Sequence, residues 1–228
     1  MGANLRPLFY VYLRQGVVMR RWSRSDYREM PWKNGGGSTT EMAVFPEGAS
    51  MDEFVWRLSA AQVNHDGPFS IFTNIDRSLA ILSGNSLSLT GAFKDDAHDH
   101  SSSVELTQTS TPFRFAGDID VMGSLPNGPI RDLNLMTRRN VCAHYMQRLL
   151  AGEHHIQAEQ AQQVLLFCAQ GQVLMNGSVE MSTEDLILLE EKIQYQGVHC
   201  HLSIPEGAMV YYMRIQFLNQ GGSDAALG

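Results

Sequence analysis

The sequence of 228 residues contains few cysteines, few charged side chains and no long apolar run. Its three cysteines form no Cys-x-x-Cys pair, so we expect free thiols, no disulfide framework and a reducing, cytoplasmic environment. Only 18% of the residues are charged, and 24 acidic against 17 basic side chains give a net charge of −7. This balance disfavours nucleic acids and anionic membranes as partners. No apolar stretch approaches the ~20 residues that cross a bilayer.

Helix signals are also scarce, and short strand signals dominate. Apolar or alternating runs end at Gly, Pro, Asn or Asp about every ten residues, as in Phe54–Ala60, Leu79–Gly84, Ser86–Gly91 and Val104–Thr109. Residues 156–167 begin with a helix-like composition and become strand-like from Val164, so the element boundary there stays open. The pattern predicts an all-β sandwich or barrel.

Two segments repeat one pattern of apolar strand, Gly turn, apolar strand and Gly. They are residues 79–91 and 164–177. The repeat resembles the cupin fold and favours a bicupin, with two cupin-like β-barrels or sandwiches in one chain and few short helices. We therefore expect an extension over 1–18, a first barrel over 19–122, a connection over 123–135, a second barrel over 136–218 and a flexible tail over 219–228.

The cupin resemblance also implies where a metal would bind, through a His-x-His pair, a Glu and a further His. In the first copy Arg77 occupies the Glu position, and in the second copy Val164 does. Neither copy has a complete ligand set, so we predict no metal, no cofactor and no catalytic residue. The alternative is a metal-dependent cupin enzyme acting on a small organic acid, with His199, His201 and Glu206 as ligands. The loop over 93–103 carries two further histidines, but ordering a polar loop around a metal costs backbone entropy.

Three motifs sharpen the resemblance to one family. They are PWKNGGGSTTE over residues 31–41, WRLSAA over 56–61 with DGPFSIF over 66–72, and RDLNLMTRR over 131–139. Together they are similar to the HutD/Ves family of two-barrel cupins, over roughly residues 20–215. The resemblance implies a cytoplasmic bacterial protein that binds a small acid, such as formylglutamate, urocanate or formate, and moderates histidine utilisation. No reaction is firmly attached to that family.

Elementary chemistry gives these motifs a binding role. Arg57 and Ser59 share one strand face, and an inward arginine needs a carboxylate, supplied by Glu41, Asp66, Asp76 or a ligand. Asp76 and Arg77 are expected at a barrel mouth, with aromatic residues as walls or as ordinary core. The glycine run can form an anion-binding nest or a tight corner. The candidate ligand-binding residues are Lys33, Asn34, Gly35, Gly36, Arg57, Ser59, Phe69, Ser70, Phe72, Asp76, Arg77 and Asn134.

A third reading stays open beside the binding protein and the metal enzyme. A purely structural or interaction protein would have a filled first barrel, with Arg57 and Arg77 fully paired to protein carboxylates. Exposed edge strands would also allow a homodimer, although the sequence does not fix the oligomeric state.

Overall fold

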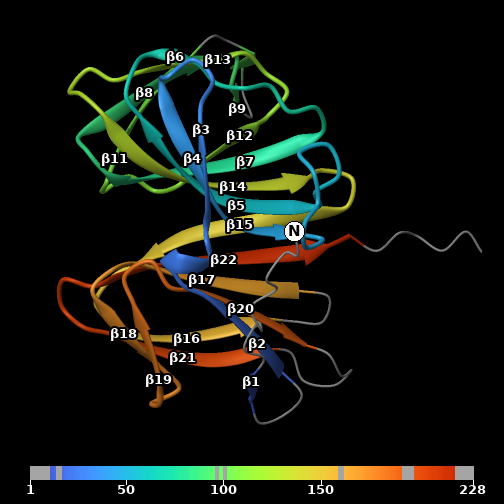
Figure 1. Cartoon of the computed structure of the whole chain (residues 1–228), viewed down its shortest axis with the longest axis vertical. Helices are drawn as coiled ribbons and strands as arrows, with labels where there is room; N and C mark the ends of the chain where they lie inside the picture. Colours follow the sequence, from blue (N-terminus) through green and yellow to red (C-terminus); the bar gives the residue numbers. More distant parts are fainter. Residues whose placement is uncertain are drawn as a thin grey trace, which may run out of the picture.

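The computed structural model describes residues 11–13, 17–95, 98–99, 102–158, 162–191 and 198–218. These residues form antiparallel strands and one short 3-10 turn, η1 (Arg24–Asp26), so the all-β expectation is confirmed. Figure 1 shows an upper and a lower half, each built from the same kinds of sheet. Within the described residues, no helix has the length and apolar character needed to cross a membrane.

The upper half contains a six-stranded and a four-stranded sheet. The larger has the order β12 (Phe113–Ala116), β7 (Ile75–Ser83), β14 (Ile130–Arg138), β5 (Trp56–Val63), β4 (Gly37–Phe45) and β3 (Arg28–Pro31). The smaller has the order β11 (Ser102–Thr107), β8 (Ser86–Gly91), β13 (Val121–Ser124) and β6 (Gly67–Pro68). A separate short pair consists of β9 (Lys94–Asp95) and β10 (His98–Asp99).

The lower half repeats this plan. Its six-stranded sheet has the order β1 (Val11–Leu13), β2 (Val17–Trp22), β20 (Leu186–Glu191), β17 (Gln162–Gln170), β22 (Met209–Phe217) and β15 (Cys142–Leu149). Its four-stranded sheet has the order β16 (Gly152–Ala158), β21 (Val198–Ile204), β18 (Gln172–Met175) and β19 (Val179–Ser182). The segment over 156–167, whose boundary the sequence left open, therefore contains the end of strand β16 and the start of strand β17.

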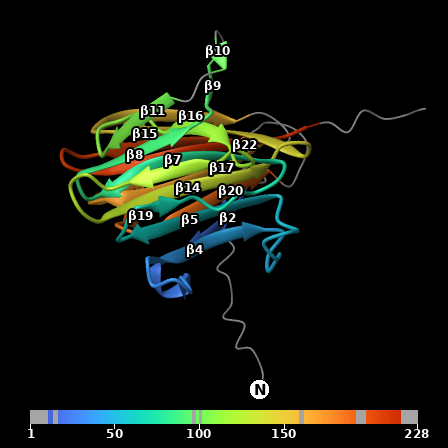
Figure 2. The ribbon, with the colours of Figure 1, turned by 90° about the horizontal axis from the view of Figure 1, so that it is seen from above.

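The central strands of each six-stranded sheet, such as β7, β14 and β17, are buried on both faces, which explains their apolar composition. One face of β7 and β14 packs into the core of the upper half, while Leu133 and Leu135 face the lower half. There they meet Leu165 and Phe167 of β17 in a core that both halves share. Seen from above, the strands of the upper half overlie those of the lower half (Figure 2). Alternation along β14 therefore assigns every second side chain to the upper core and the others to the junction.

The repeat found in the sequence corresponds to two equivalent hairpins, β7–β8 and β17–β18. Gly84 and Gly171 occupy their turns with φ of +91° and +82°. A Cβ on Gly84 would lie 2.5 Å from the Pro129 carbonyl oxygen, and one on Gly171 would lie 2.7 Å from the Ala208 Cβ. Both turns thus press against the residue that precedes the central strand, β14 or β22, of their own half.

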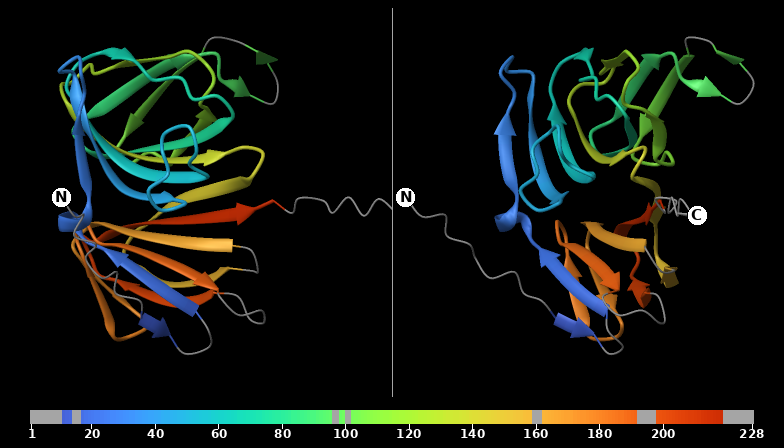
Figure 3. Two further views of the ribbon diagram at one scale, coloured as in Figure 1. Left: turned by 45° about the vertical axis from the view of Figure 1, so that its right-hand side comes forward. Right: turned by 90° about the vertical axis from the view of Figure 1, so that its right-hand side faces the viewer.

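The structure places two boundary segments differently from the sequence expectation. Strand β2 pairs with β20 of the lower half, from Val17↔Glu191 to Trp22↔Leu186, although residues from 19 onward were expected in the first barrel. The blue chain in Figure 3 passes accordingly from the lower half up to β3 and β4. The expected connection over 123–135 contains the end of β13 and more than half of β14. The polar residues of this part of β14 face a buried interior.

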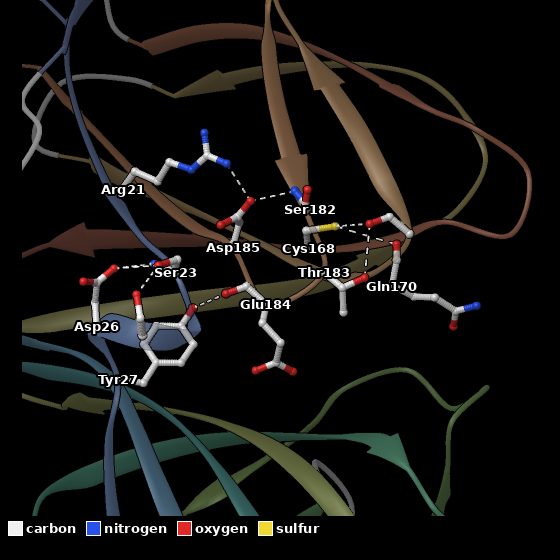
Figure 4. Close-up of polar contacts among 12 residues, drawn as sticks. Arg21, Ser23, Asp26, Tyr27, Cys168, Gln170, Ser182, Thr183, Glu184 and Asp185 are labelled. Atoms are coloured by element: carbon white, nitrogen blue, oxygen red, sulfur yellow. Dashed lines mark hydrogen bonds and ion pairs between the residues drawn. The ribbon is translucent and has the colours of Figure 1, made fainter.

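Polar contacts reinforce the junction between the halves (Figure 4). Tyr27 donates a hydrogen bond of 2.6 Å to the carbonyl oxygen of Glu184, and Arg131 pairs with the carboxylate of Glu184 through both terminal nitrogens. Arg21 donates to Asp185 at 2.7 Å. The turn between β19 and β20 is therefore tied to segments on both sides of the junction.

Candidate functional site

Two buried guanidinium groups lie at one level of the upper half. Met136 of β14 is in register with Arg57 of β5 on one side and with Arg77 of β7 on the other. Residues paired directly across antiparallel strands face the same side of the sheet, so both arginines point into the core of the upper half. Each is only 4% exposed. With strands about 4.8 Å apart, their Cα atoms are separated by roughly 10 Å.

Arg57 has a protein carboxylate as its partner. Its Nε donates to Oε2 of Glu41 at 2.7 Å, and its Nη1 donates to the Ser59 hydroxyl at 3.2 Å. Strand β4 changes register between Glu41 and Ala43, and such a bulge re-aims the side chains around it. Glu41 also lines an outer groove between β2 and β4, so its carboxylate lies at the border between the site and solvent.

Arg77 has a different environment, made largely of aromatic rings. Its guanidinium carbon lies 5.1 Å from the ring centre of Phe69, 5.6 Å from that of Phe72 and 5.2 Å from that of Phe115. Nη1 donates to the Ser70 carbonyl oxygen at 3.3 Å, so Ser70 contributes its backbone. Within the described chain, Nε of Arg77 is buried and has no hydrogen-bond partner. Burial lowers the pKa of Arg77 to about 10. Attraction by Asp132 opposes this effect, and repulsion by Arg57 adds to it.

Further polar side chains of β14 point into the same core. Asn134 is in register with Ser59 and Leu79, and its buried Oδ1 has no hydrogen-bond partner among the described residues. Asp132, 2% exposed, accepts a hydrogen bond of 3.2 Å from the Ala61 amide. Burial raises the pKa of Asp132 to about 7, against the opposing effect of Arg77. An interior with two guanidinium groups, one of which has a buried Nε–H without a partner among the described residues, is suited to a small anion.

The structure places Asp76 away from this interior. It is the neighbour of Arg77 on β7, so its side chain faces the opposite side of the sheet. Its two oxygens accept hydrogen bonds of 2.8 Å from Arg114 and Arg139. Although burial opposes ionisation, these two arginines hold the pKa of Asp76 below its ordinary value. Asp66, another candidate partner, accepts a hydrogen bond from the Leu125 amide at 2.7 Å.

The segment Lys33-Asn34-Gly35-Gly36 forms the turn between β3 and β4. Lys33 is exposed, and the Gly35 and Gly36 amides donate to the Trp32 carbonyl and to Oδ1 of Asn34, both at 3.0 Å. Gly37 pairs with Val63, six residues along β5 from Arg57. At about 3.3 Å per residue this is roughly 20 Å, which one small acid does not span. The turn matches the tight-corner reading of the sequence.

The histidines proposed as alternative metal ligands lie on the outer side of β21. Cys200, between His199 and His201, points into the lower core. Nε2 of His201 lies 2.8 Å from Oε2 of Glu153, and Glu206 is exposed in the turn before β22. Among the described residues, no three His, Cys, Asp or Glu side chains form a group that could hold a metal ion. The loop histidines near residue 98 have side chains outside the described part of the structure.

Glu41, Asp132 and Phe115 belong to the geometry of the site but were not among the candidate ligand-binding residues. The sequence indicates Glu41 only as a possible partner of Arg57, and the structure confirms this pair. Asp132 carried a usable signal, since it alternates with Leu133 and precedes Asn134 by two positions on the same strand face. Phe115 carried none, because its contact with Arg77 depends on the pairing of β12 with β7.

Comparison with known proteins identifies the family. The model of the HutD family matches residues 24–208. The chain belongs to the HutD family. It is 37% identical over 121 residues, 51% of this chain, to Protein Ves of Citrobacter koseri, and 38% identical over 111 residues, 49% of this chain, to an uncharacterised 21.2 kDa protein in the hutC 3' region of Pseudomonas putida. The matched parts span only 58% and 54% of those two relatives.

Solved structures agree with membership of the HutD family. HutD from Pseudomonas fluorescens SBW25, solved in a formate condition, superposes with a TM-score of 0.73 at 27% identity, covering 88% of this chain and 100% of that one. Oxalate decarboxylase from Bacillus subtilis gives a TM-score of 0.57 at 8% identity, covering 86% of this chain and 76% of that one, which is a likeness of fold alone. The resemblance to the HutD/Ves family and to the cupin fold is thereby confirmed.

Proposed function

We propose that this HutD-family chain is a non-enzymatic binding protein for a small carboxylate, built as a bicupin. The upper and lower halves are its two cupin-like barrels, and the ligand binds inside the upper one. Its carboxylate is held by Arg57 and Arg77, with Ser59 and Asn134 as further hydrogen-bonding groups. Phe69, Phe72 and Phe115 form apolar walls.

The observation that carries this proposal is the unequal pairing of the two buried arginines. Arg57 has Glu41 at 2.7 Å, whereas within the described residues no carboxylate forms an ion pair with Arg77. A buried guanidinium without a carboxylate is costly, and a ligand carboxylate offers two oxygens in the geometry that guanidinium groups prefer. The structural alternative, with both arginines fully paired to protein carboxylates, does not describe Arg77.

The chemistry of the cysteines gives no support to catalysis by a thiol. The three cysteines are buried, and burial raises the pKa of Cys142 and Cys168 to about 11 and that of Cys200 to about 12. A thiol with so high a pKa is a poor nucleophile near neutral pH. Free buried thiols are also compatible with a reducing cytoplasm.

The relatives supply the biological setting of the proposal. The Pseudomonas putida relative is described by its position beside hutC, and the Pseudomonas fluorescens relative is itself named HutD. We therefore place this chain in histidine utilisation, where binding of a metabolite would moderate the pathway. The formate condition of the HutD structure makes formate the first ligand to test, followed by formylglutamate and urocanate.

Titration calorimetry tests the site. We expect saturable binding of at least one of these three acids, and a loss of about tenfold or more in the Arg77→Met and Arg57→Met variants, because a hydrogen bond to a charged group contributes ~1.5–3 kcal/mol. Arg114→Gln is the matched control, since Arg114 neighbours Phe115 but is exposed and pairs with Asp76. No saturable binding, or equal loss in the control, contradicts the proposal.

A further inference from the structure

The lower half has an arginine, Arg214, at the strand register that corresponds to the register of Arg57 and Arg77 in the upper half. We call this register a level of the sheet. In the upper half the central residue of this level, Met136 of β14, is flanked by Arg57 and Arg77. In the lower half the corresponding central strand is β22, where Arg214 is in register with Tyr145 of β15 and with Val164 of β17. The repeat of hairpins β7–β8 and β17–β18 makes Val164 the counterpart of Arg77 and Tyr145 the counterpart of Arg57. The lower half therefore carries one cation where the upper half carries two.

Arg214 points to the inner side of its sheet. Val210 and Tyr212, on the same face of β22, pack into the lower core, while Tyr211, Met213 and Ile215 face the junction. Arg214 follows Tyr212 toward the end of the strand and is half-buried. In Figure 1 the arrows of β14 and β22 both end on the right, so the two levels lie toward the same side of the molecule.

The described surroundings of Arg214 are aromatic. Its guanidinium carbon lies 6.0 Å from the ring centre of Tyr145, and the rings of Tyr145 and Tyr212 meet edge to face at 6.3 Å. Among the residues that the structure describes, Arg214 takes part in no ion pair with a carboxylate. Burial raises the pKa of the Tyr212 hydroxyl, and the charges that act on it come from Arg214, Cys200 and Tyr145. The hydroxyl therefore stays protonated and able to donate a hydrogen bond.

The exposed aromatic surface distinguishes this level from its counterpart in the upper half. Tyr145 is 47% exposed although it lies on the inner face of β15, whereas Arg57 at the corresponding position is 4% exposed. The Tyr145 ring projects into solvent and offers a flat surface for stacking. The neighbouring Arg214 guanidinium offers two N–H groups to the two oxygens of a carboxylate.

We propose that Arg214, Tyr145 and Tyr212 form a second anion-binding site, independent of the one in the upper half, for a small carboxylate with a planar, unsaturated body. Arg214 holds the carboxylate through its guanidinium edge, and the Tyr145 ring stacks on the planar body. A single cation in a chain of net charge −7 favours a monoanion over a phosphate dianion. Because it does not use Arg57 or Arg77, this site stands or falls separately from the proposed function.

Nuclear magnetic resonance of the full chain with 13C-labelled tyrosine tests the site, with benzoate as the planar probe and acetate as the non-planar one. The background is Arg77→Met, which silences the upper site. We expect benzoate to shift the ring resonances of Tyr145 and Tyr212 and to saturate in the millimolar range, as befits so small a ligand. Addition of Arg214→Gln should weaken benzoate binding about tenfold or more. Tyr145→Leu should reduce the affinity for benzoate more than that for acetate.

Arg148→Gln is the matched control, because Arg148 lies on the same strand as Tyr145 and donates to the Gln108 and Thr109 carbonyl oxygens outside the site. It should leave the benzoate titration unchanged. The proposal is overturned if benzoate leaves both tyrosine rings unshifted, or if Arg214→Gln and Arg148→Gln weaken binding equally. It is also overturned if inorganic phosphate binds more tightly than benzoate.

Discussion

Asp132 and His144 are buried side chains that respond to pH in opposite directions. Burial raises the pKa of Asp132 to about 7, so its folded form binds a proton more readily than the unfolded form, whose value is 3.8. Burial lowers the pKa of His144 to about 4 from 6.5, with Arg114 adding to the effect and Asp76 opposing it. His144 lies between the hydroxyls of Thr137 and Ser78, at 2.6 and 2.8 Å, and its burial favours the neutral imidazole.

These shifts predict opposing slopes of stability with pH. Between about 4 and 6.5, Asp132 makes the free energy of unfolding fall as pH rises, because the folded state holds the extra proton. His144 makes it rise over the same window, because the unfolded state then binds the proton. Each slope is at most ~1.4 kcal/mol per pH unit, so they largely cancel in the wild type.

Denaturant unfolding of two variants separates the slopes. Asp132→Asn should become more stable as pH rises through this window, and His144→Asn should become less stable. The slope is the readout, so a uniform loss of stability in either variant does not obscure it. If both variants keep the pH dependence of the wild type, neither group titrates as inferred.

The ion pair of Arg57 and Glu41 predicts that loss of the Glu41 carboxylate lowers the stability of the fold and raises the affinity for the ligand. Glu41→Gln leaves the guanidinium buried without a carboxylate, so we expect the free energy of unfolding to fall by about 2 kcal/mol, less than for a fully enclosed pair because Glu41 keeps 19% of its side chain exposed. Removal of this competing anion should also raise the affinity for the carboxylate ligand. Calorimetry and denaturant unfolding on the same variant measure the two effects. A variant that is destabilised and also binds more weakly would contradict the role given to Glu41.

The equivalent hairpin turns give a prediction for the repeated elements. Gly84→Ala and Gly171→Ala place a Cβ at positive φ and within 2.5 and 2.7 Å of a neighbouring atom. We expect each to lower the free energy of unfolding by ~2–4 kcal/mol. Gly177→Ala is the control, because Gly177 has a φ of +68° with nothing within 4 Å, and it should cost only about 1 kcal/mol. If all three variants lowered the free energy of unfolding equally, the close packing of Gly84 and Gly171 against their neighbours would contribute nothing to stability.

The strands were largely predictable because their signals are local. Leu79–Gly84 and Val164–Cys168 are continuous apolar runs that end at turn residues, and both are strands of central sheets. Arg57 and Ser59 were correctly placed on one inward face, since alternation fixes faces once Trp56 is assigned to the junction. Phe69 and Phe72, within eight residues of Arg77, are predicted beside it from the sequence, whereas Phe115 contacts Arg77 only because strand β12 pairs with β7.

The partner of a strand is the information that local patterns do not contain. Residues 17–22 have strand character, yet nothing in them specifies β20, about 170 positions away, as their partner. The segment over 123–135, expected as a connection, also contains strand residues that its local pattern does not identify. The Gly- and Pro-rich run over 123–129 indicates a link between the halves, but residues 130–135 belong to strand β14, where Asp132 and Asn134 are polar groups of a buried interior.

The shared core at the junction predicts that the two halves unfold together. Leu135 of the upper half and Met213 of the lower half are both fully buried in this core, and the contacts of Tyr27 and Arg131 with Glu184 reinforce the same junction. A core with members from both halves loses its apolar burial from both when either half opens. Two-barrel chains with small, polar junctions would instead unfold in separate steps.

Leu135→Ala and Met213→Ala test this coupling by calorimetry. Each truncation leaves a cavity and should cost ~2–5 kcal/mol. For a chain of this size, that corresponds to a fall of roughly 5–15 °C in the temperature of one common transition. A surface truncation, Leu150→Ala, should leave the transition in place, because Leu150 is 52% exposed. Two resolved transitions, with Leu135→Ala moving one and Met213→Ala moving the other, would mean that the halves fold independently despite their shared core.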